Sequence, residues 1–122
     1  MPYVEVLAPP APPEHKATLA RSVTDSLMSA FSVGAETVTL YFLPIAPGDY
    51  AHAGKMGPQG TRQRILLKVH AFRRSEAARR AAAAALTRSV CTTYGVPADD
   101  VAVYFLDREK NEVAHASILA SD

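Results

Sequence analysis

Two similar stretches decide the fold: Val33-Gly34-Ala35-Glu36-Thr37-Val38-Thr39-Leu40-Tyr41-Phe42-Leu43 and Val96-Pro97-Ala98-Asp99-Asp100-Val101-Ala102-Val103-Tyr104-Phe105-Leu106. Six of the eleven aligned positions are identical, at an offset of 63. The same offset aligns Pro2-Tyr3-Val4-Glu5-Val6 with Ile65-Leu66-Leu67-Lys68-Val69. The chain is therefore predicted to be one domain, 1–122, with an internal repeat of two units, 2–63 and 65–122.

The first unit is predicted to be strand, helix, strand. Residues 3–8 alternate in character, which is typical of a strand. Prolines delay the helix until Pro13, a residue that is well placed at a first helical position. Apolar side chains then recur at helical spacing as far as Phe31, and Gly34 ends the helix. A second strand is expected over 37–43.

The second unit repeats this order with a strand at 65–71, a helix at 76–94 and a strand at 101–106. Ser75 is a plausible N-cap of the helix, which Gly95 and Pro97 terminate. Short connections around each helix indicate right-handed parallel crossovers. The predicted fold class is α/β (α+β): a four-stranded mixed sheet with two helices on one face. The open face would carry apolar side chains that favour self-association, such as Tyr41, Leu43, Tyr104 and Leu106.

Two segments show no regular pattern. Residues 44–64 are rich in Pro and Gly, and they are expected to form a structureless connection that is either functional or a solvated linker. The tail from Asp107 to Asp122 is polar at first and then apolar at Ile118-Leu119, and it is expected to reach a neighbouring subunit.

Composition indicates an ordinary globular protein, with 48% hydrophobic residues and a net charge of +1. This charge gives no reason to expect nucleic acid or an anionic membrane as a partner. No apolar run is long enough to span a membrane, and no signal-peptide pattern is present. The single cysteine, Cys91, excludes an internal disulfide. A cytoplasmic location is therefore expected.

Pro2 is the first candidate for chemistry. Removal of Met1 would leave Pro2 as a free secondary amine on a rigid ring. Burial and nearby cations disfavour the charged form of an amine, so the nitrogen could serve as a neutral base or nucleophile. The alternative is an inert residue at the start of a strand.

Arg73 and Arg74 form the second candidate, at the start of the second helix. Guanidinium groups and free backbone N–H groups there would together bind an anion. The alternative is a solvated basic turn, continued by Arg79 and Arg80, which are expected to be exposed. No metal-ligand pattern, phosphate loop or Ser-His-Asp order is present.

The whole chain resembles the tautomerase superfamily in its length, its Pro after Met1 and its two fused strand-helix-strand units. The stretches 69–76 and 99–105 are most similar to the second halves of its malonate semialdehyde decarboxylase and cis-3-chloroacrylic acid dehalogenase groups. The resemblance implies a tautomerase/MIF-like fold, an amino-terminal proline catalyst, a homotrimer, and neither metal nor cofactor. Its substrates would be small carboxylates: 2-oxo acids, enols or unsaturated acids.

The resemblance also implies roles for individual residues. Pro2 matches the catalytic proline and Arg74 an arginine that binds the substrate carboxylate. Arg73 lies next to a position where the family often has a second arginine. Tyr104 matches an active-site tyrosine, with an ordinary core tyrosine as the alternative, and His115 falls where the dehalogenase group has a glutamate.

Other positions depart from the family pattern. The dehalogenase group has a histidine on the first helix, where this chain has Leu27-Met28. The decarboxylase group has an aspartate at the start of the second strand, where this chain has Thr37. The residues that activate water in those groups are thus missing or changed. Keto–enol tautomerisation by Pro2 is the favoured reaction. The alternatives are a related lyase, hydratase, decarboxylase or dehalogenase, and a non-catalytic oligomer that binds a ligand or partner.

Overall fold

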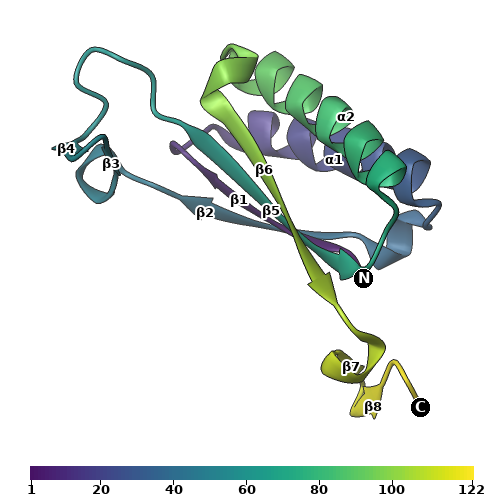
Figure 1. Ribbon diagram of the computed structural model, residues 1–122. Helices are drawn as coiled ribbons and strands as arrows, with labels where there is room; N and C mark the ends of the chain where they lie inside the picture. Colours follow the sequence, from purple (N-terminus) through teal and green to yellow (C-terminus); the bar gives the residue numbers. More distant parts are fainter.

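A computed structural model describes residues 1–122 and contains one four-stranded mixed sheet covered by two helices (Figure 1). The main elements are β1 Tyr3–Ala8, α1 Pro13–Phe31, β2 Thr39–Pro44, β5 Ile65–Phe72, α2 Glu76–Tyr94 and β6 Val101–Arg108. The strand order is β2-β1-β5-β6. β1 and β5 pair antiparallel in the centre, and each pairs parallel with the second strand of its own unit. The predicted fold class is confirmed.

Three of the four helix ends lie where local signals place them. The prediction that Gly34 ends the first helix is wrong, because α1 ends at Phe31 and Ser32 adopts the left-handed C-cap conformation, with a φ of +54°. Pro13 occupies the first turn of α1, and the Ser75 side chain accepts a hydrogen bond from the Ala78 N–H to cap α2. Gly95 ends α2 with a φ of +67°, a left-handed conformation that glycine adopts without strain. Neither helix is long and apolar enough to cross a membrane.

The core lies between the sheet and the helices. Alternate residues of the two central strands are fully buried there, and they meet apolar side chains spaced three or four positions apart on the helices. This core comprises Val4, Val6, Ala8, Leu19, Val23, Leu27, Phe31, Ile65, Leu67, Val69, Ala71, Ala82, Leu86 and Val90.

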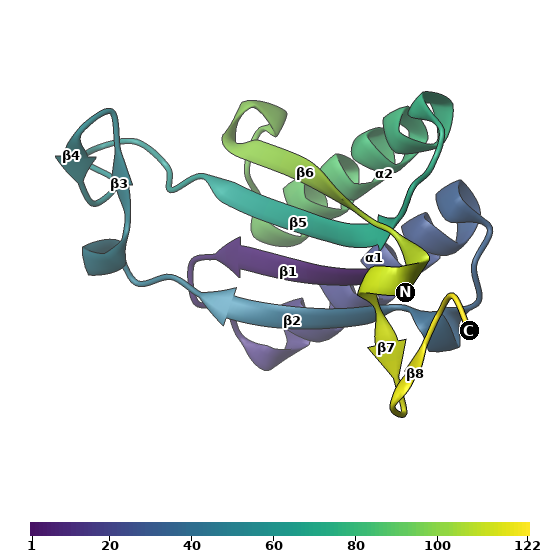
Figure 2. The same cartoon turned by 60° about the horizontal axis from the view of Figure 1, so that its bottom comes forward.

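The other face of the sheet is uncovered, with both helices behind it (Figure 2). Tyr41 and Tyr104 on the outer strands are exposed there, as expected. The centre of this face is not apolar, however, because β1 and β5 place Glu5, Lys68 and His70 side by side. The open face is therefore apolar at the outer strands, as predicted, but polar where Glu5, Lys68 and His70 lie in its centre.

The segment predicted to be structureless holds a small hairpin, β3 Ala51–His52 and β4 Lys55–Met56. The tail holds a matching hairpin, β7 Ala114–His115 and β8 Ile118–Leu119. The two coincide at the offset of 63, and equivalent backbone hydrogen bonds join their ends, from Gly57 N–H to the Tyr50 carbonyl at 2.7 Å and from Ala120 N–H to the Val113 carbonyl at 2.8 Å. Both hairpins project from the body of the molecule, at opposite ends (Figure 1). The duplicated structure thus extends through the loop and the tail.

Candidate active site

Pro2 lies at the start of a central strand and is fully buried. The Thr39 N–H of β2 donates a hydrogen bond of 3.3 Å to the Pro2 carbonyl. On the other side, the register of β1 with β5 pairs Tyr3 with His70, which sets Pro2 level with Ala71. Pro2 precedes Tyr3 in the strand alternation, so its ring shares the helix-covered side with Val4. The ring is thus held rigidly at one end of the sheet.

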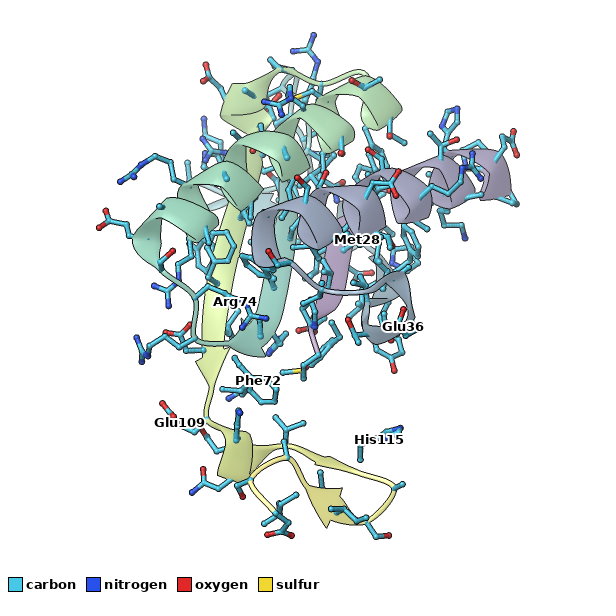
Figure 3. The ribbon with its side chains drawn as sticks, turned by 90° about the vertical axis from the view of Figure 1, so that its right-hand side faces the viewer. Met28, Glu36, Phe72, Arg74, Glu109 and His115 are labelled. Atoms are coloured by element: carbon cyan, nitrogen blue, oxygen red, sulfur yellow. The ribbon has the colours of Figure 1, made fainter.

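Arg74 lies at the same end of the sheet, between β5 and α2 (Figure 3). Its Nη1 donates a hydrogen bond of 2.9 Å to the Phe72 carbonyl, and its guanidinium carbon lies 5.0 Å from the centroid of the Phe31 ring. No carboxylate forms a salt bridge with it, although it is half-buried. The Arg74 guanidinium is therefore held in place, but no carboxylate balances its charge.

Arg73 is in a different situation. It is 67% exposed and pairs with Asp107 at the end of β6, at 3.0 Å. Arg79 shares this carboxylate, with its Nη2 2.6 Å from both oxygens. The expectation that Arg79 is exposed is wrong, because this ion pair holds its side chain partly buried. Arg80 is exposed and pairs only with Glu76.

His115 and Pro2 line one cavity of about 540 Å³, between the start of the sheet and the C-terminal hairpin. Tyr3, Thr37, Thr39 and Tyr41 also line it. Figure 3 shows His115 and Glu109 on the tail, below the end of the sheet near which Arg74, Phe72, Met28 and Glu36 are grouped. The structure therefore brings His115 to Pro2 from the side opposite to Arg74.

Tyr104 is not part of this cavity. It lies on the open face of β6, in register with Lys68, and 62% of it is exposed. The structure thus separates Tyr104 from Pro2 within one chain. Sequence reasoning missed Tyr3, Thr39 and Tyr41 as cavity residues; their position on the strands that flank Pro2 was the available signal.

A polar cluster continues across the sheet from the cavity. The His70 ring stacks on Tyr3 with centroids 4.2 Å apart, and His70 Nε2 donates a hydrogen bond of 2.6 Å to Glu5. Arg108 donates to His70 Nδ1 at 3.3 Å, which fixes the proton of the neutral ring on Nε2. The hydrogen bond from His70, with the nearby Lys68 charge, holds the pKa of Glu5 below its ordinary value.

No group of three His, Cys, Asp or Glu side chains is arranged to hold a metal ion. The polar groups at this end of the sheet are the Arg74 guanidinium and the hydroxyl and imidazole groups of the cavity.

The comparisons with known proteins identify structural relatives. No family model and no curated protein sequence matches the chain. Among solved structures, Pt0534 inactivated by 2-oxo-3-pentynoate matches with a TM-score of 0.87 and 26% identity, over 98% of this chain and 96% of that one. The asymmetric trimer of F6 fused 4-OT matches with a TM-score of 0.89 and 19% identity, over 98% and 96%.

A third structure is N1, a member of the cis-3-chloroacrylic acid dehalogenase family. It matches with a TM-score of 0.79 and 18% identity, over 96% of this chain and 82% of that one. The fold is that of the tautomerase superfamily. The near-complete coverage of the fused 4-OT structure shows that the chain has the two-unit form of this tautomerase fold.

Proposed function

We propose that the chain is a cofactor-independent tautomerase acting on small 2-oxo acids or enols, with Pro2 as the catalytic base. The observation that carries this proposal is the position of Pro2: buried at the start of a central strand, at the end of the sheet where Arg74 carries an unpaired charge. Likeness to Pt0534, which 2-oxo-3-pentynoate inactivates, supports a 2-oxo acid as the ligand.

The proposed reaction is a proton transfer. With Met1 removed, the neutral Pro2 nitrogen takes a proton from the enol oxygen or carbon of the substrate and returns it to the other atom. Arg74 binds the substrate carboxylate and stabilises the negative charge that develops on the enolate. We assign a lesser part to Arg73, because it already pairs with Asp107 and is largely exposed. His115 and Tyr41 line the cavity and are proposed to contact the substrate.

We propose a homotrimer as the active assembly. The F6 fused 4-OT structure is a trimer and covers 98% of this chain. Exposed Tyr41 and Tyr104 on the open sheet, together with the exposed Ile118 of the projecting tail, offer apolar surface to neighbouring copies.

A second candidate reaction is hydration or hydrolytic dehalogenation of an unsaturated acid. It is favoured by His115, which lines the same cavity as Pro2, since an imidazole can activate water. Turnover of 3-chloroacrylate without turnover of enols would favour this candidate over tautomerisation.

The test combines labelling with turnover. The triple bond of 2-oxo-3-pentynoate is conjugated to a carbonyl, so a neutral amine adds to it and retains the whole reagent as an adduct. We expect the adduct on the N-terminal peptide of the wild type and not of Pro2→Ala. Phenylenolpyruvate, 2-hydroxymuconate and malonate semialdehyde then identify the reaction. If neither an adduct nor turnover is observed, the proposal that the chain is an enzyme is contradicted, and a non-catalytic ligand-binding oligomer is favoured.

A further inference from the structure

The internal repeat creates two equivalent hollows, one at each end of the sheet, and they differ greatly in size. The hollow at the Pro2 end has a volume of about 10 Å³, and the one at the opposite end has a volume of about 340 Å³. Eight of the nine residues that line the larger hollow occupy positions that line the smaller one, at the offset of 63. They are the same site in the two copies of the unit.

Side-chain size explains the difference in volume. In the second copy, Arg74 stacks on Phe31 and fills the hollow, and the Asp107–Arg79 ion pair closes it. In the first copy, Ala11 replaces Arg74 and Pro44 replaces Asp107. The first copy therefore lacks the groups that fill the hollow of the second copy, but it has equivalent apolar walls at Val6, Ala8 and Phe42.

Two polar groups remain there without partners. Lys16 is the counterpart of Arg79; it is half-buried and forms no salt bridge, because Pro44 offers no carboxylate. Tyr94 is the counterpart of Phe31 and adds a hydroxyl, which forms no hydrogen bond within the chain. The Tyr94 hydroxyl is a donor at neutral pH, as any tyrosine hydroxyl is, and burial raises its pKa further.

The surroundings are positive and apolar. No Asp or Glu lines the hollow, and its walls are apolar side chains such as Val6, Ala8 and Phe42. A larger hollow of about 520 Å³ adjoins it, shares Tyr94, and adds His15 and Arg62, again without a carboxylate. An unpaired ammonium group, a phenol donor and apolar walls are together suited to a carboxylate with a hydrocarbon body.

We propose that this hollow, on the opposite end of the sheet from Pro2, is a second binding site for small apolar monocarboxylates. Lys16 pairs with the carboxylate, Tyr94 donates a hydrogen bond to it, and the hydrocarbon part packs against Val6 and Phe42. Ile65 occupies the position that corresponds to Pro2, so the site has no amine at the strand start. The site therefore binds its ligand without converting it, and it does not depend on the reaction proposed for Pro2.

The test uses benzoate and the full chain in its own assembly, observed by NMR of assigned methyl groups. We expect saturable shifts of the Val6 and Ala8 methyls as benzoate is added. Lys16→Met should raise the Kd for benzoate roughly tenfold, the effect of one charge-assisted hydrogen bond at a half-exposed site. Lys110→Met is the matched control, since Lys110 is exposed at the other end of the molecule, and its Kd should equal that of the wild type.

A second variant tests the cavity itself. Ala11→Leu places a larger side chain where Arg74 fills the equivalent hollow, so it should abolish the Val6 and Ala8 shifts while the melting temperature is retained. Three outcomes would overturn the proposal: no saturable shift in the wild type, an unchanged Kd in Lys16→Met, or benzamide binding as tightly as benzoate. The turnover assay tests a separate proposal, because a failure of benzoate to bind beside Lys16 would not change the activity expected at Pro2.

Discussion

The guanidinium carbon of Arg74 lies 5.0 Å from the centroid of the Phe31 ring, at the end of the sheet where Pro2 begins β1. This contact holds the arginine over an aromatic face, and the Phe72 carbonyl fixes one of its nitrogens. Asp107 pairs with both Arg73 and Arg79, but no carboxylate pairs with Arg74. Of the three arginines nearest the start of α2, Arg74 is thus the one available to a substrate carboxylate.

Arg74→Ala is expected to lower kcat/KM about 10- to 150-fold, the equivalent of one charge-assisted hydrogen bond. The free energy of unfolding should fall by about 1 kcal/mol, because the contact with Phe31 is lost. Steady-state kinetics and urea unfolding measure the two effects. Arg80→Ala is the control, since Arg80 is exposed and pairs only with Glu76. Unchanged turnover of a carboxylate substrate in Arg74→Ala would show that another group binds the carboxylate.

The helices and the sheet could be predicted because their signals are local or repeated. Pro13, Ser75 and Gly95 mark helix ends within a few residues, and the predicted helix 76–94 has the bounds of α2. The parallel pairing of the two strands within each unit follows from the crossover rule, but this rule does not decide that β1 and β5 meet in the centre of the sheet.

The hairpins were missed because strands of two residues are too short to show periodicity. A signal was nevertheless present, since Ala51-His52-Ala53-Gly54 and Ala114-His115-Ala116-Ser117 align at the offset of 63. The ion pair between Arg79 and Asp107 joins residues 28 positions apart, and nothing in the local sequence indicates such a contact. The unequal volumes of the two hollows could not be predicted either, because they depend on which side chains meet across the fold.

Pro2→Ala is expected to fold normally and to lose most tautomerase activity, because a primary amine on a flexible residue replaces the ring nitrogen. In this structure the Pro2 nitrogen lies in a peptide bond to Met1 and has no basicity. The intact mass of an active wild-type preparation should therefore be lower by one methionine residue. Full activity in a preparation that retains Met1 would exclude Pro2 as the base.

Glu5 makes the stability of the fold sensitive to acid. The hydrogen bond from His70, at 2.6 Å, is the main cause that holds the pKa of Glu5 below its usual 4.5, with Lys68 adding to it and burial opposing it. Because the folded-state pKa is the lower one, the ionised carboxylate stabilises the fold at pH above about 4.5. This contribution is lost as the pH falls through the folded-state value.

Urea unfolding at a series of pH values measures this effect. The difference in stability between the wild type and Glu5→Gln should be constant near neutral pH and should shrink below about pH 4.5. Glu14→Gln removes an exposed carboxylate that forms no salt bridge, so its difference from the wild type should stay small throughout. If the difference in stability between the wild type and Glu5→Gln stays constant below about pH 4.5, the contact with His70 does not shift the pKa of Glu5.

Assembly is expected to depend on the open face of the sheet, where Tyr41 and Tyr104 are 57% and 62% exposed. Light scattering of the wild type should report about three chains per particle. Tyr104→Glu should dissociate this particle, because burying a carboxylate in an apolar contact without a partner costs several kcal/mol. Ala84→Glu is the matched control: it adds the same charge at an exposed position of α2, on the other side of the sheet, and should leave the trimer intact. A wild type that remains a single chain at micromolar concentration would contradict the homotrimer.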